Sequence, residues 1–226
     1  MVCARRLARA IPHVRQQRSW DCGLACCDMV LRALGRESSL RQLTQRAQSE
    51  SLWTIDLAHI LHDHGVKFKF FTTSLGANPA YHSEDFYRAT LDDDSQRVSE
   101  LFERAVRDDS MHVELRSFAP AEFRELIRPN DSIVMALVDQ RRLYPPMSAS
   151  FLPPPASSFL ARFIAGKSAY AGHFVLIAGM DAARDAYVVM DPARDDAAVS
   201  VPRADVDAAR RSWGTDEDLI VVPRGQ

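Results

Sequence analysis

Three side chains of the types that could form a nucleophilic catalytic site occur in this sequence as Cys22, His173 and Asp191. Cys22 stands at the predicted start of a helix, where the partial positive charge of the N-terminus favours a thiolate. A thiolate nucleophile needs an imidazole within hydrogen-bond distance, and His173 is the candidate base. A carboxylate that orients this imidazole completes the set, and Asp191 is the candidate. The pattern predicts attack of the Cys22 thiolate on an amide or another acyl bond.

The oxyanion formed in such an attack needs hydrogen-bond donors. The side-chain amide of Gln16, six residues before Cys22, and the backbone N–H of Cys22 are the predicted donors. Gln17 is the alternative to Gln16, one position along the chain. His173 begins a predicted strand and Asp191 ends the next one, so a hairpin would bring their side chains together.

The remaining cysteines do not indicate a metal site. Cys3, Cys26 and Cys27 lie close to Cys22, so these thiols cannot link distant loops, and we expect them to be reduced. Their spacing does not fit zinc; we expect Cys26 in the core and Cys27 partly exposed. The acidic runs 92–94 and 216–218 are explained more simply as helix caps and turn residues. We therefore expect neither a metal nor another cofactor.

The composition of the chain limits which classes of protein it can belong to. The chain has 226 residues, of which 46% are hydrophobic and 26% charged, and this predicts one globular domain over residues 1–226. The net charge of −2 and the interspersed charges argue against a nucleic-acid partner. No apolar run fits a signal peptide or a membrane helix. We expect an intracellular, cytoplasmic protein that acts on a peptide or protein substrate, and composition does not indicate its oligomeric state.

Hydrophobic periodicity places helices in the first part of the chain. Asp21 is a predicted N-cap and Gly35 a predicted stop for a helix that contains Cys22. Thr54 and Asp94 are the predicted caps of two later helices. The predicted helices cover residues 22–34, 39–48, 54–64, 95–107 and 120–128, and predicted strands cover residues 66–72 and 112–116.

The second part of the chain is mainly β in its pattern. Residues 132–138 are almost continuously apolar, which predicts a central strand buried on both faces. Residues 173–180, 186–191 and 218–222 predict adjacent antiparallel strands, the last of them an edge strand after a turn at Gly214. The prolines in residues 143–169 predict a long loop inserted in the domain.

Long stretches of the chain resemble known families. The motif QQRSWDCGLAC, followed by GHFVLIAGMD and VVMDPA, is similar to bacteriocin-leader-processing peptidases and their papain-like relatives. This resemblance implies an α+β, papain-like cysteine-peptidase fold, with a helical N-terminal lobe packed on an antiparallel sheet lobe. It also implies that the matched Cys22, His173 and Asp191 are catalytic.

A second resemblance extends over almost the entire chain, to the guanylyl cyclase domain-containing family of eukaryotes. It rests on WDCGLAC, SLWTIDLAHILHDHGV, FYRATLDDDSQRV, GHFVLIAGMD and SWGTDEDLIVV. The family name implies conversion of GTP to cyclic GMP, with Mg²⁺ and GTP as requirements. The sequence has no phosphate-binding loop of the G-x4-G-K-[ST] type and no evident pair of strand-borne aspartates for two magnesium ions.

The sequence therefore leaves three hypotheses for the function. The leading hypothesis is a Cys-His-Asp thiol hydrolase. The alternatives are a guanylyl cyclase and a noncatalytic protein whose cleft binds a peptide without cutting it.

Overall fold

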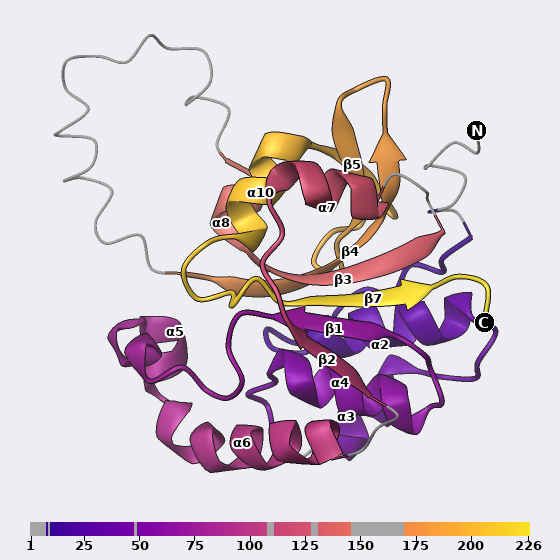
Figure 1. Ribbon diagram of the computed structural model, residues 1–226. Helices are drawn as coiled ribbons and strands as arrows, with labels where there is room; N and C mark the ends of the chain where they lie inside the picture. The colour runs from indigo at the N-terminus through magenta and orange to yellow at the C-terminus, as the bar shows by residue number, and fades with distance from the viewer. Residues whose placement is uncertain (1–7, 9, 48, 108–110, 128–130, 146–169) are drawn as a thin grey trace, which may run out of the picture.

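A computed structural model describes residues 8, 10–47, 49–107, 111–127, 131–145 and 170–226. Within these ranges the chain forms a seven-stranded mixed sheet with helices on both faces (Figure 1). The order of the strands across the sheet is β2-β1-β7-β3-β4-β5-β6. The α+β class predicted from the sequence is confirmed at this level, and the papain-like assignment stays a prediction.

Strand pairing is antiparallel except between β1 and β2, which run parallel at one edge. The expected antiparallel sheet is therefore a mixed one. The strands are β1 (Lys69–Thr72), β2 (His112–Leu115), β3 (Ser132–Asp139), β4 (Gly172–Asp181), β5 (Ala186–Met190), β6 (Val199–Pro202) and β7 (Leu219–Pro223).

The helices divide between the two faces of the sheet, as Figure 1 shows. α2 (Cys22–Ala33), α3 (Leu40–Arg46), α4 (Thr54–Asp63) and α6 (Leu91–Arg107) lie on one face, and α7 (Pro120–Ile127), α8 (Gln140–Leu143) and α10 (Arg203–Arg210) lie on the other. The short η1 (Pro79–Ser83) and α5 (Asp85–Arg88) precede α6.

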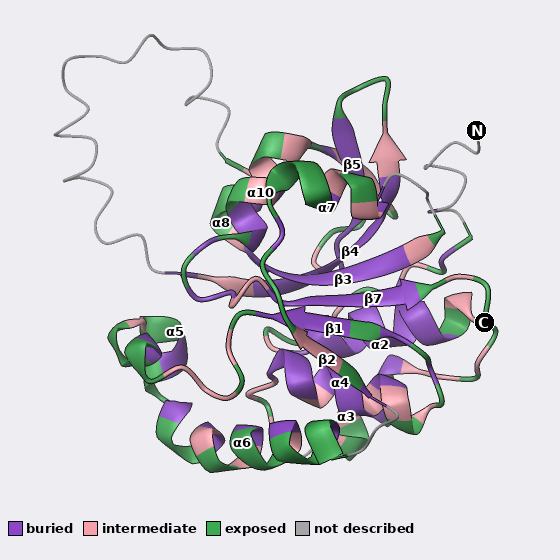
Figure 2. Cartoon of the chain, in the orientation of Figure 1, coloured by how far each residue is buried: buried purple, intermediate pink, exposed green. Residues whose placement is uncertain are grey.

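Two hydrophobic cores follow from this arrangement, one on each face of the sheet. Along β4, Phe174 and Leu176 belong to the core beneath α2 and α4, whereas Val175 and Ile177 belong to the core beneath α7 and α10. Successive side chains of a strand point to opposite faces, so a strand covered on both sides must be apolar throughout. Figure 2 shows the central strands buried and the outward faces of the helices exposed.

Helix α2 carries the candidate nucleophile and is buried over Cys22–Leu31. The predicted start at Cys22 is confirmed. The predicted stop is also confirmed, because Gly35 follows the helix with φ of 70°, a conformation that costs glycine little. Gly23 allows α2 to pack closely, since a Cβ there would lie 2.6 Å from Leu57 Cδ1 and 3.1 Å from Phe174 Cδ2.

Of the three predicted caps, Asp21 was right in its position and the other two were wrong. Asp21 occupies the N-cap position of α2, but its side chain makes no capping hydrogen bond. The N-cap of α4 is Trp53 rather than Thr54, with Asp56 accepting the Trp53 N–H at 2.8 Å. α6 begins at Leu91, so Asp94 lies inside the helix, where it is buried. Asp94 instead accepts the Trp53 indole N–H, so a tertiary partner rather than a helix end holds it.

The last strand was also misplaced in the prediction. β7 does not lie beside β4 or β5 and is not an edge strand; it is inserted between β1 and β3. Hydrophobic pattern alone does not encode which strands are neighbours. β6 and α10 were not predicted at all. The central position of β3 is confirmed.

The predicted loop over residues 143–169 cannot be compared in full. α8 ends at Leu143, and residues 146–169 lie outside the described residues. In the described ranges, no helix combines the length and the apolar character that a membrane crossing requires.

Candidate functional site

The turn before α2 is shaped by a buried carboxylate. The side chain of Asp21 accepts the backbone N–H groups of Gln17 and Arg18 at 3.2 and 3.0 Å, while its backbone carbonyl accepts the first helical bond from Ala25 at 2.9 Å. The chain therefore folds tightly back just before the helix. Cys22 follows as the first helical residue and is only 7% exposed.

The candidate base and its orienting carboxylate are brought together by the β4–β5 hairpin. His173 is the second residue of β4, and Asp191 directly follows β5. His173 Nε2 lies 2.7 Å from Asp191 Oδ1, and both side chains are buried. The same Asp191 oxygen accepts the backbone N–H of Ala193 at 2.8 Å, which fixes the carboxylate.

These neighbours set the charge of the imidazole. Burial by itself lowers the pKa of His173, but hydrogen bonds to Asp191 and Cys22, together with their charges, outweigh it and raise the pKa to about 9. Burial likewise disfavours the charged form of Asp191, yet the hydrogen bond and charge of His173 hold its pKa below the ordinary value. Because Nε2 contacts Asp191, Nδ1 is the ring atom left for Cys22.

The two following cysteines differ from Cys22. Cys26 and Cys27 are fully buried, and their thiols face the carbonyls of Phe174 and Leu57 at 3.5 and 3.9 Å. Burial raises the pKa of each thiol above its ordinary value. Cys26 is in the core as predicted, and the prediction that Cys27 is partly exposed was wrong. Both are therefore inert thiols in the core.

Gln16 lies beside the Asp191 segment. Its backbone N–H donates to the Pro192 carbonyl at 2.9 Å, which ties the stretch before Cys22 to the end of the hairpin. Its side-chain amide nitrogen donates to the Arg18 carbonyl at 2.8 Å. An amide nitrogen has two N–H groups, so one remains for another acceptor. Gln17, the alternative, is exposed.

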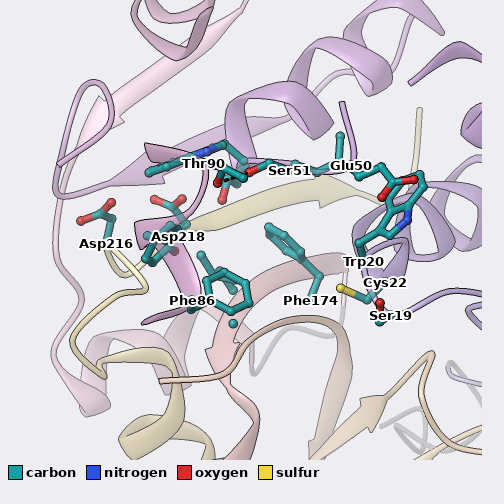
Figure 3. Close-up of a pocket in the computed structure, with 16 residues that line it drawn as sticks. Ser19, Trp20, Cys22, Glu50, Ser51, Phe86, Thr90, Phe174, Asp216 and Asp218 are labelled. Carbon is teal, nitrogen blue, oxygen red and sulfur yellow. Dashed lines mark hydrogen bonds between the residues drawn. The ribbon is translucent and has the colours of Figure 1, made fainter. Parts of the chain in front are cut away.

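A cavity of about 450 Å³ opens beside Cys22, within the size range of small-molecule sites. Figure 3 shows Ser19, Trp20 and Cys22 at one end, Phe86 and Phe174 in the middle, and Asp216 and Asp218 at the other end. Trp20 therefore forms part of the cavity wall beside Cys22. Trp53 lines the cavity too, with its indole N–H donating to the buried Asp94 at 3.0 Å.

Sequence reasoning treated the two aspartates at the far end as turn residues. Asp216 accepts the Tyr81 hydroxyl at 2.5 Å. Burial, followed by the nearby charge of Asp216, raises the pKa of Asp218 to about 8, although the Thr54 and Thr72 hydroxyls favour its ionised form. An available signal was the position of Asp218, directly before a strand of entirely apolar residues, where its side chain is carried into the core.

The donor set does not favour a resident metal. Among the described residues, no three His, Cys, Asp or Glu side chains are grouped so that they could hold a metal ion. The pocket carboxylates are Glu50, Asp216 and Asp218, and with a pKa of about 8 Asp218 is mostly protonated at pH 7. These residues fit a structural or catalytic metal ion poorly.

Comparison with known proteins gives the family. The model of the family described as "Guanylylate cyclase" matches residues 11–222, which include Gln16, Cys22, His173 and Asp191. The chain is 40% identical over 213 residues to "Guanylyl cyclase 1" of Arabidopsis thaliana, a match that covers 94% of this chain and 75% of that protein. The resemblance to the guanylyl cyclase family noted in the sequence is thereby confirmed, and the chain belongs to the guanylylate cyclase family.

Proposed function

We propose that this chain is a thiol hydrolase that attacks an amide or another acyl bond through Cys22. The single observation that supports the proposal best is the 2.7 Å contact between His173 Nε2 and Asp191. This contact leaves Nδ1 for the thiol of Cys22, which stands at a helix start and lines the cavity. A peptide or protein-derived amide is the proposed substrate class.

The proposed reaction has two steps. The Cys22 thiolate attacks the acyl carbon, and the protonated His173 gives its Nδ1 proton to the leaving amine as the C–N bond breaks. Water, deprotonated by the neutral His173, then attacks the thioester, which releases a carboxylic acid and restores the thiol. Asp191 holds the imidazole in one tautomer, and the Cys22 N–H and the free N–H of Gln16 would stabilise the oxyanion.

Selective alkylation tests this proposal. We expect iodoacetamide to label Cys22 at pH 6 far faster than Cys26 and Cys27, which are matched internal controls on the same helix. Labelling of Cys22 should slow at least about tenfold in His173→Ala, because the thiolate loses its cationic partner. Peptide mass spectrometry gives all three rates in one sample. Equal, slow labelling of Cys22 in wild type and variant would exclude an activated thiol.

Guanylyl cyclase activity is the second candidate, and it rests on the family and on the name of the Arabidopsis relative. Phosphate recognition usually draws on Lys, Arg or a bound cation, and within the part of the chain that the structure describes neither Lys nor Arg lines the cavity beside Cys22. The residues do not indicate how a triphosphate would be held, so we derive no step through a metal.

The two candidates separate in one assay series. Formation of cyclic GMP from GTP and Mg²⁺ would be measured for wild type, Cys22→Ala and Asp218→Asn. Activity that persists in Cys22→Ala would favour the cyclase, whereas acyl transfer that disappears in that variant supports the hydrolase. If Cys22→Ala retains acyl transfer, the hydrolase proposal fails.

A further inference from the structure

The far end of the cavity combines carboxyl groups with aromatic surface. Asp216 and Asp218 line this end, and a third carboxylate, that of Glu50, lies toward Trp20 at the other end (Figure 3). Among the described residues, no Lys, Arg or His side chain lines the cavity. A cavity with this composition attracts cations and repels anions.

Asp218 has a buried carboxylate oxygen that a ligand could satisfy. The residue is only 7% exposed and lines the cavity. The Thr54 and Thr72 hydroxyls favour its ionised form, yet its Oδ1 atom has no hydrogen-bond partner in the part of the chain that the structure describes. A buried carboxylate oxygen without a partner is costly and uncommon in folded proteins. A donor from a bound molecule would satisfy it.

Aromatic rings surround the same end of the cavity. Tyr87 lies 5.1 Å from Trp53 and 4.9 Å from Phe86 between ring centroids, and all three residues line the cavity. Gly172 leaves room for this cluster, because a Cβ there would lie 2.8 Å from Phe86 Cζ. Aromatic faces attract ammonium and guanidinium groups, most strongly where water is excluded.

The pairing of the strands sets the backbone separation between Asp218 and the strand that carries His173. Leu137 of β3 donates its N–H to the Asp218 carbonyl at 3.2 Å, and Leu137 pairs on its other side with Phe174, the residue after His173. Two steps of strand spacing therefore separate Asp218 from the His173 region, which is about 10 Å. A group bound at Asp218 can belong to a molecule whose reacting carbon lies at Cys22.

We propose that Asp218, with Asp216 and the aromatic residues Trp53, Phe86 and Tyr87, forms a subsite for a primary ammonium or guanidinium group of the substrate. The subsite deepens the proposed hydrolase, since it specifies an acyl substrate with a cationic group at the end of the cavity opposite the bond that is attacked. A free triphosphate has the opposite charge and is disfavoured there.

Affinity labelling of the full chain tests the subsite. Three chloroacetamides would be compared, each with a four-carbon chain on the amide nitrogen that ends in an ammonium, a hydroxyl or a carboxylate. We expect the ammonium reagent to alkylate Cys22 at least about tenfold faster than the hydroxyl reagent, and the carboxylate reagent to be the slowest. The assay would be run at pH 8, where the reagent amine is protonated and Asp218 is about half ionised, with Asp216, Tyr87 and Tyr170 as its titratable neighbours.

Variants test which residues cause the preference for the ammonium reagent. Asp218→Asn should reduce the ammonium-to-hydroxyl rate ratio to near one, and Asp216→Asn should reduce it in part. Asp93→Asn, an exposed position on α6 outside the cavity, is the matched control and should keep the wild-type ratio. A wild-type ratio near one, or a high ratio retained in Asp218→Asn, would overturn the subsite, and the wild-type comparison stands even if Asp218→Asn does not fold.

The rate ratio also separates this proposal from the hydrolase proposal. The ratio compares two reagents on one thiol, so the intrinsic reactivity of Cys22 cancels. Fast iodoacetamide labelling with a ratio near one refutes the subsite alone. Slow, His173-independent labelling with a high ratio refutes the hydrolase and leaves the cation subsite in place.

Discussion

Replacing Asp191 with asparagine should uncouple the His173 imidazole from its charge. The hydrogen bond and charge of Asp191 are among the causes that raise the pKa of His173 from its ordinary 6.5 to about 9 against the opposing effect of burial. This rise corresponds to about 3 kcal/mol in favour of the imidazolium form. Without the carboxylate, burial is less opposed, and we expect the pKa of His173 to fall well below its wild-type value.

Two measurements follow the change. Long-range proton–nitrogen NMR spectra of the imidazole, recorded from pH 5 to 10, give the pKa of His173 directly in wild type and Asp191→Asn. Iodoacetamide labelling of Cys22 at pH 7 should slow by about tenfold or more, because the imidazolium that stabilises the thiolate is depleted. Asp196→Asn, an exposed position in the same loop, is the control and should leave both readouts unchanged.

A wild-type His173 that titrates near 6.5 would show that Asp191 and Cys22 do not stabilise its charged form. An unchanged titration in Asp191→Asn would show that the 2.7 Å contact carries no electrostatic weight. Either result would remove the physical basis for an activated Cys22.

Two further predictions concern folding stability, both measured by urea unfolding. Because the folded state raises the pKa of His173, its stabilisation is fully present below pH 6.5 and is lost as pH rises to about 9; the stability difference between wild type and His173→Gln should shrink across that window, and a constant difference would contradict the shift. Gly23→Ala should destabilise the protein by about 1–3 kcal/mol, because the new methyl meets the buried Leu57 side chain at 2.6 Å. Gly225→Ala, with open space around it, should change stability little, and equal effects at the two glycines would refute the packing argument.

Several features of the molecule could be predicted from the sequence because they depend on near neighbours in the chain. The start of α2 at Cys22 and its end before Gly35 follow from local helix signals. The apolar run of β3 identified a strand covered on both faces. The pairing of β4 with β5 follows from their short connection, and it explains why His173 and Asp191 were expected to be close.

Other features depend on residues far apart in the sequence, and these were missed. Asp94 has the pattern of a helix cap, yet it lies within α6, where it accepts the Trp53 indole N–H from another helix. β7 has the pattern of an edge strand, yet it lies between β1 and β3. A local pattern records which faces are apolar but does not record which segment covers them.

The sequence by itself determined the local chemistry of this protein: a cysteine at a helix start, and a histidine and an aspartate at the ends of a hairpin. Only the tertiary structure decided what that chemistry faces. The β7 insertion places Asp218 across Leu137 from Phe174, and packing of α4 and α5 encloses the cavity with Trp53 and Phe86. Burial and the like charge of Asp216 raise the pKa of Asp218, whereas the pKa of His173 rises because hydrogen bonds to Asp191 and Cys22, together with their charges, outweigh burial.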